Sequence, residues 1–230
     1  MDLEKLSSLA ENLRKEVIGD PVWNAEKRVF EYEDQSIEVV AILKLLRGIQ
    51  GVRAQEVLCQ NGLFIDMGAI YRCVSDCSDE IYFLLEEYPA YKSKCVKQFV
   101  QHFFEHTIDG IEEAGARSVP KKKIHASRVR MLSEHASEKS LRDMLEKPYK
   151  TFCGYIHANY AHIMQNYGGQ RPDLSFNILG IPSDSQKTMN MQMAQLAYAS
   201  MLLSMMFVCR ALKQGKMYLE AKELLDNEKK

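Results

Sequence analysis

The most regular pattern in this sequence is a heptad-like repeat of apolar residues between positions 63 and 87. Its members follow one another at intervals of three or four residues, and they are Met67, Ile70, Val74, Cys77, Ile81 and Leu84. Residues at this spacing lie on one face of an α-helix, so the segment predicts a long helix with a buried seam. Such a helix needs other helices to cover its seam.

Helical periodicity recurs along most of the chain. It predicts helices over 3–17, 36–60, 89–112 and 184–213, a short helix over 140–147, a helix from Pro148 to Gly168, and a solvated helix over 215–228. No strand pair is expected, and residues 22–34, with the only tryptophan (Trp23), are expected to pack on the helices as a connector. The sequence therefore predicts an all-α protein, a bundle of about six to eight helices with an irregular loop before a long C-terminal helix.

Two glycines interrupt the predicted helix over 36–60. Gly48 and Gly51 each destabilise a helix interior by about 1 kcal/mol relative to alanine. Their presence there predicts that another helix approaches closely.

The length of 230 residues suits a single domain with a substantial core. We expect one helical-bundle domain over 1–230, with a candidate internal boundary at 114–123. The boundary falls in the segment 114–130, which contains Pro120 and no acidic residue and therefore predicts a linker.

Charge and cysteine usage limit the class of protein. A net charge of −1 gives no global attraction to nucleic acid or to anionic membranes. None of the six cysteines forms a C-x-x-C pair, so we expect small buried thiols in a reducing compartment. The first residues are amphipathic rather than signal-like, and the apolar run 193–212 is interrupted by polar residues and Arg210, which favours a buried helix over a membrane span. We therefore predict a cytoplasmic protein without a membrane partner.

Metal and cofactor motifs are incomplete. The run from His102 to His106 matches the zinc-peptidase pattern H-x-x-E-H but lacks the further acidic ligand and the setting of that pattern. None of the six histidines follows a glutamate by three residues, which excludes a di-iron bundle, and no Walker or Rossmann loop occurs. We expect no metal and no cofactor.

The segment 147–182 has the densest run of tyrosine, histidine and asparagine in the chain. Its helical spacing predicts a mostly buried aromatic stripe consisting of Tyr149, Phe152, Ile156, Tyr160, Ile163 and Tyr167. Lys150 and His157 are two helical turns apart, so they share a line beside this stripe. A cation above an imidazole can bind a phosphate and transfer a proton, which makes the pair the candidate catalytic residues. The alternative is a structural histidine bonded to a neighbouring element.

Basic residues cluster between 117 and 130. Lys121, Lys122, Lys123, Arg128 and Arg130 are the candidate nucleic-acid-binding residues, because each cation can neutralise part of a phosphate backbone. The alternative is a solvated segment whose charges are balanced by acidic neighbours. The methionines between 189 and 206 likewise allow two interpretations, core packing or an adaptable docking surface.

Two stretches carry a resemblance to known proteins. The run YIHANYAHIMQNYGG (155–169), followed by a Phe and a Gly, and the run AIYRCVSD (69–76), with an Arg and an acidic residue, resemble segments of uncharacterised bacterial helical proteins. Those families are distantly similar to HEPN domains, helical bundles that are often dimeric and often tied to RNA cleavage or to toxin and defence systems. The resemblance spans roughly residues 36–182.

The HEPN nuclease motif is an Arg, four to six residues, and a His. Carried over to this chain, the histidine is His157, but Lys150 stands where the family has Arg. Lysine lacks the planar fork that binds phosphate at two points. The literal motif occurs elsewhere, from Arg130 or Arg128 to His135, at a frequency that chance explains.

The sequence thus favours a protein that acts chiefly through self-association or a protein partner. The heptad seam and the lack of a complete catalytic set are the reasons. The alternative is a metal-independent ribonuclease or RNA-binding toxin or defence component, with His157 as acid/base and Lys150 on phosphate.

Overall fold

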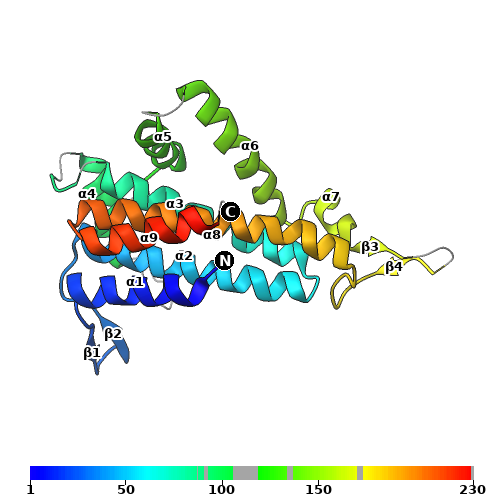
Figure 1. Ribbon diagram of the computed structural model, residues 1–230, viewed down its shortest axis with the longest axis horizontal. Helices are drawn as coiled ribbons and strands as arrows, with labels where there is room; N and C mark the ends of the chain where they lie inside the picture. Colours follow the sequence, from blue (N-terminus) through cyan, green and yellow to red (C-terminus); the bar gives the residue numbers. More distant parts are fainter. Residues whose placement is uncertain (87, 91–92, 106–118, 134–136, 170–172, 229–230) are drawn as a thin grey trace.

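The computed structural model describes residues 1–86, 88–90, 93–105, 119–133, 137–169 and 173–228 (Figure 1). Its elements are α1 (Leu3–Val17), β1 (Val22–Asn24), β2 (Val29–Glu31), α2 (Ile37–Gln60), α3 (Phe64–Leu85), α4 (Lys94–Glu105), α5 (Lys121–Leu132), α6 (Glu138–Ile156), α7 (Tyr160–Ile163), the 3₁₀ helix η1 (Met164–Asn166), β3 (Tyr167–Gly168), β4 (Ser175–Phe176), α8 (Asp184–Ala211) and α9 (Gly215–Asn227). The predicted all-α class is confirmed. The expectation of no strand pair is wrong, because β1 pairs with β2 and β3 pairs with β4, both antiparallel.

The helices α1, α2, α3, α8 and α9 lie side by side along the long axis of the molecule (Figure 1). They share one apolar core, whose fully buried members include Leu6, Leu13, Ile42, Leu45, Ile81, Tyr198, Met201 and Leu202. The predicted seam of α3 is buried at every position except Ile70, which is partly buried against the same core. Because α2 and α8 both pack on α3, helices of the same chain cover the seam.

Gly48 and Gly51 lie where α2 meets its neighbours. A Cβ at Gly48 would lie 2.2 Å from the Met201 sulfur on α8, and a Cβ at Gly51 would lie 2.4 Å from a methyl group of Val74 on α3. The predicted close approach of other helices is therefore confirmed.

The start of α8 matches the prediction, whereas the start of the fourth helix does not. Ser183 caps α8 by accepting a hydrogen bond from the Gln186 backbone N–H, as its capping pattern predicts. The fourth helix starts at Lys94 rather than at Pro89 and reaches Glu105. The rest of its predicted span, including His106, lies outside the described residues.

α6 differs most from the prediction. A single helix runs from Glu138 through Pro148 and ends at Ile156, so the predicted break before Pro148 is wrong. The chain then turns at Ala158, which has a positive φ of 48°, and continues as the short α7. The first two members of the predicted aromatic stripe contact α3, Tyr149 at Arg72 and Phe152 at Tyr71.

The remaining members of the stripe are exposed, so their predicted burial is wrong. The exposed fractions are 47% for Ile156, 79% for Tyr160, 41% for Ile163 and 43% for Tyr167. Helical spacing identified a common face for a continuous helix, but the turn at Ala158 carries the later residues away from the core.

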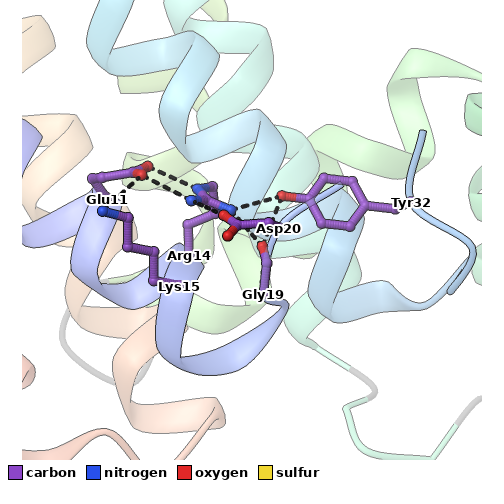
Figure 2. Close-up of polar contacts among 6 residues, drawn as sticks. All are labelled: Glu11, Arg14, Lys15, Gly19, Asp20 and Tyr32. Atoms are coloured by element: carbon purple, nitrogen blue, oxygen red, sulfur yellow. Dashed lines mark hydrogen bonds and ion pairs between the residues drawn. The ribbon is translucent and has the colours of Figure 1, made fainter. Parts of the chain in front are cut away.

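The segment between α1 and α2 is a small hairpin rather than a packed connector. Trp23 contacts Phe30 across the two strands and is 52% exposed, so its predicted packing on the bundle is wrong. Figure 2 shows how the chain is fixed just before the hairpin. The Arg14 guanidinium bonds Asp20 (2.7 Å), Glu11 (2.8 Å) and the hydroxyl of Tyr32 (3.2 Å), and it also contacts the Gly19 carbonyl.

The basic segment predicted to be a linker is the helix α5. It packs against α3, and α6 packs against both, so these two helices cover one side of α3 (Figure 1). Of the candidate boundary at 114–123, residues 114–118 lie outside the described residues, and Lys121–Lys123 form the first turn of α5.

The cysteines and α8 match the predictions in part. Cys59, Cys77 and Cys209 are buried, and burial raises the pKa of each thiol, to about 11 for Cys77 and about 12 for Cys209. Cys73 is exposed, contrary to expectation. By length and composition alone α8 could cross a membrane, and 50% of its most apolar window is buried inside the protein.

Candidate functional site

The predicted catalytic pair lies on the exposed surface of α6. Lys150 pairs with Glu146 one turn earlier, at 2.6 Å. His157 is the C-cap of the helix and is exposed as well. Neither residue lines the cleft described below, so the pair lies apart from the charged side chains of that cleft.

The predicted nucleic-acid-binding cluster divides between two faces of α5. Lys122 and Lys123 are exposed. Lys121 pairs with Asp76 and Glu80 on α3, at 3.0 Å each, and Arg130 pairs with Glu86. Arg128 is largely buried against α3. Carboxylates of α3 therefore balance much of the basic charge, while the two remaining lysines stay accessible to an anion.

The centre of the α3–α5 contact is the carboxylate of Asp79, which is 2% exposed. Its Oδ1 accepts a hydrogen bond from Arg128 at 2.6 Å, and its Oδ2 accepts one from Nδ1 of His125 at 2.8 Å. Both oxygens are therefore used. A histidine held in this way has its second ring nitrogen, Nε2, available for another group.

Further charges surround this group. Arg72, 4% exposed, pairs with Asp76 one turn later on α3. Glu80, 7% exposed, bonds Lys44 of α2 at 2.7 Å and Lys121 of α5 at 3.0 Å. We call the set Lys44, Arg72, Asp76, Asp79, Glu80, Lys121, His125 and Arg128 the charged cluster.

Three groups of the charged cluster, Asp79, Lys121 and Arg128, have pKa values that favour the ionised form despite burial. Burial alone would raise the pKa of Asp79, but the hydrogen bond from His125 and the charge of Arg128 outweigh it, so the pKa is lowered. Burial likewise opposes the charges of Arg128 and Lys121, yet their acidic partners raise both pKa values. The ion pairs therefore persist at neutral pH.

A cleft of about 310 Å³ adjoins the charged cluster. It lies between α3, α5, α6 and α8, and its lining includes Arg72, Asp79, His125 and Arg128. Apolar side chains, among them Phe152 and Leu203, make up much of the remaining wall. Clefts of this size with a few convergent polar groups are the usual form of small-molecule sites.

Aromatic rings fix α6 as one wall of the cleft. Phe152 stacks on Tyr71 of α3 with ring centroids 4.1 Å apart. Tyr149 lies between two members of the charged cluster, with the Arg72 guanidinium 4.0 Å from its ring centre and the His125 ring 4.5 Å away. Some of the aromatic residues concentrated in this segment of the sequence, Tyr149 and Phe152 among them, therefore form a wall of the cleft.

The charged cluster was missed in the sequence, although one signal for it was present. Arg72 and Asp76 belong to the stretch that carries the family resemblance, and Asp79 and Glu80 follow on the same helix. Arg72, Asp76 and Asp79 have the spacing of one helix face beside the apolar seam. A charged line beside a buried seam predicts that a basic helix covers it.

A second unusual region is the end of the molecule around α7 and the β3–β4 hairpin. Most of the exposed large apolar side chains among the described residues occur between positions 156 and 196. Leu196 lines the cleft described above, and we call the other members of this set the apolar end: Ile156, Tyr160, Ile163, Tyr167, Leu174, Phe176, Ile178, Leu179 and Met189. Leu179 is 94% exposed and Ile178 is 82% exposed.

The β3–β4 hairpin projects beyond the helices (Figure 1). Tyr167 and Phe176 pair across its strands, with ring centroids 5.1 Å apart. The returning chain is fixed to the α2–α3 turn by a hydrogen bond from the Ile181 N–H to the Gly62 carbonyl, 3.0 Å. Gly180 makes this contact possible, because a Cβ there would lie 2.0 Å from the Asn61 carbonyl oxygen.

Comparison of the chain with models of known protein families, with curated proteins and with solved structures found no match. Within the described residues, no group of three histidine, cysteine or acidic side chains is arranged to hold a metal ion. The candidate sites therefore rest on their own geometry: the charged cluster with its cleft, and the apolar end.

Proposed function

We propose that this protein is a helical-bundle interaction protein that associates with a second copy of itself through the apolar end. The observation that carries the proposal is the concentration of exposed apolar side chains in one region, which soluble monomers rarely show. The HEPN-like family resemblance and the predicted cytoplasmic location agree with this role.

The size of the apolar end suits a protein interface. An aromatic side chain buries about 150–250 Å² when fully covered, so a set of half-exposed rings and aliphatic chains offers several hundred Å². One partner's share of a standard interface is about 800 Å². The apolar end is therefore of the right order for a dimer contact.

The lack of charge in residues 156–169 is compatible with a second copy as the partner. Residues 156–169 contain no lysine, arginine, aspartate or glutamate. A two-fold interface brings the same patch of both copies together, so a charged patch would place like charges opposite each other, whereas an uncharged apolar patch is complementary to itself.

The hairpin supports the same conclusion. An isolated two-stranded hairpin is marginally stable in water, and β3–β4 projects from the bundle with Leu174 and Phe176 exposed. Docking on a second copy would cover these side chains. The α3 seam does not serve this purpose, because α2 and α8 already cover it.

Light scattering after size-exclusion chromatography tests the proposal. The wild-type chain should elute as a dimer that dissociates on dilution, and the double variant Ile178→Asp, Leu179→Asp should elute as a monomer. The matched control is Leu219→Asp, because Leu219 is 64% exposed but lies on α9, away from the apolar end. A wild-type chain that stays monomeric at high concentration, or a double variant that still dimerises, contradicts the proposal.

RNA cleavage is the second candidate function. The observation in its favour is that Lys150 and His157 are both exposed and accessible to a large substrate. His157→Ala should then abolish cleavage of RNA while leaving stability unchanged, because the side chain is exposed. Equal cleavage by both proteins, or none by the wild type, rules this function out.

RNA binding without cleavage is tested separately, by the salt dependence of retention on RNA. Lys122 and Lys123 are exposed cations of α5, and retention on RNA should fall steeply with salt if they contact phosphates. Replacing both with glutamine should reduce that salt dependence. Retention that does not change in the variant excludes the role of these lysines.

A further inference from the structure

We propose that the cleft between α3, α5, α6 and α8 binds a small organic carboxylate, whose head group contacts Arg72, Arg128 and His125 and whose apolar body lies against Tyr71 and Phe152. This inference does not rest on the dimer proposed above, because Leu196 is the one exposed apolar residue between positions 156 and 196 that lines the cleft, and it is not counted in the apolar end. Three properties of the cleft lead to it.

The first property is an excess of positive charge. The charged cluster contains four cations, Lys44, Arg72, Lys121 and Arg128, against three carboxylates, Asp76, Asp79 and Glu80. Asp76 and Glu80 are each shared between two cations, so the cluster has one more cation than it has carboxylates. Buried charge is costly unless it is compensated, so a single anion in the cleft would balance the cluster.

The second property is a set of unused hydrogen-bonding atoms. Nε of Arg72, Nε of Arg128 and Nε2 of His125 are buried and have no hydrogen-bond partner among the described residues. The residues that carry them line the same cleft. Buried polar atoms are nearly always satisfied in native proteins, and an unmet one costs about as much as a lost hydrogen bond. A carboxylate has the acceptor oxygens that two guanidinium N–H groups require.

His125 is suited to the same ligand. Asp79 accepts the Nδ1 hydrogen bond at 2.8 Å, which fixes the ring orientation and leaves Nε2 as the ring nitrogen that can contact the ligand. The carboxylate oxygens of Asp79 are both engaged, so they do not compete with the ligand for these donors.

The third property is the apolar wall. Val74, Phe152, Leu196, Ala199 and Leu203 also line the cleft. A volume of about 310 Å³ lies at the lower limit of small-molecule pockets. The cleft therefore fits a compact acid with an aromatic or branched body rather than a nucleotide or a peptide.

The probe for the test is 3-phenylpropionate, and its uncharged amide, 3-phenylpropanamide, is the matched control. Titration of the ¹⁵N-labelled full chain in physiological salt should shift the Nε–H resonances of Arg72 and Arg128 in a saturable manner. For a probe of this size the dissociation constant should be on the order of a millimolar or lower. The amide should not produce these shifts.

Two variants distinguish the loss of ligand binding from a loss of folding. Arg72→Gln leaves Asp76 with a partner, because Lys121 also bonds Asp76 at 3.0 Å. The variant should lower the affinity for the probe about 10–100-fold, which is the effect of losing a hydrogen bond to a charged group. Ala199→Phe leaves the charged cluster intact and fills the cleft, so it should abolish binding while the protein stays folded. Lys150→Gln, outside the cleft, should bind as the wild type does.

The outcomes are distinct. Saturable binding of the acid that Ala199→Phe abolishes supports the proposal. Absence of saturable binding to the folded wild type, equal binding of acid and amide, or unchanged binding by folded Ala199→Phe overturns it.

Discussion

Charged side chains are buried where α5 meets α3, whereas apolar side chains are exposed at the apolar end. In the first region every buried carboxylate has a cationic partner from another helix, as with Asp79 and Arg128 at 2.6 Å. In the second region side chains such as Leu179, 94% exposed, lie outside the bundle. Burial of charge is tolerated because the partners are supplied within the chain; exposure of apolar surface is tolerated when a partner comes from outside it.

The largest expected effect is in the charged cluster. Asp79→Asn removes the carboxylate that pairs with Arg128 and His125, and loss of one partner from a buried ion pair typically destabilises a protein by about 3–5 kcal/mol. Denaturant unfolding measures it. Glu86→Gln, which breaks the more exposed pair with Arg130, should cost no more than about 1 kcal/mol. Equal effects of the two variants would remove the distinction between the charged cluster and an ordinary surface pair.

The destabilisation caused by Asp79→Asn should depend on pH. Because the folded-state pKa of Asp79 is lowered, its stabilisation is fully present above the unfolded pKa of about 3.9 and is lost as the pH falls through the folded pKa. The difference in unfolding free energy between wild type and Asp79→Asn should therefore be constant near neutrality and shrink below about pH 4. A difference that stays constant into acid would show that Asp79 does not act through its charge.

α8 contains both a buried and an exposed methionine, so the core and the apolar end can be compared within one helix. Met201 is fully buried in the core, whereas Met189 is 62% exposed in the apolar end. Met201→Ala should lower stability by about 2–5 kcal/mol, and Met189→Ala should change it by less than about 0.5 kcal/mol under conditions where the protein is monomeric. Thermal unfolding of both variants at low concentration measures the contrast. Similar losses would mean that Met189 packs on its own chain.

The smallest expected change in stability comes from the tip of the apolar end. Leu179→Asp should leave the monomer's unfolding free energy within about 0.5 kcal/mol of the wild type, because the side chain is almost fully exposed. At concentrations where the wild type dimerises, the variant should lose the concentration dependence of its melting temperature. A marked destabilisation of the dilute protein would place Leu179 in the monomer's own fold.

Local signals in the sequence predicted much of the fold. The α3 seam, the Ser183 cap and the close approach at Gly48 and Gly51 all depend on spacing or on single residues, and the structure confirms them. The boundary of α6 was not predictable in the same way. The turn at Ala158 interrupts a regular apolar period, and periodicity cannot tell whether the helix that it describes is continuous.

The charged cluster required information that the sequence does not contain. Asp79 and Arg128 are 49 positions apart, and each is ordinary by itself. The basic residues of α5 suggested phosphate, and only their position against α3 shows that several are neutralised. The exposure of Tyr160 and Leu179 is likewise a property of the assembled bundle.

Hydrogen exchange at two protein concentrations tests the central claim, that a second copy covers the apolar end. Amides of residues 156–169 and 173–179 should become more protected above the dimer's dissociation constant than below it, while those of α1 and α9 should not change. Increased protection confined to another surface, or protection that is independent of concentration throughout the chain, would contradict the account.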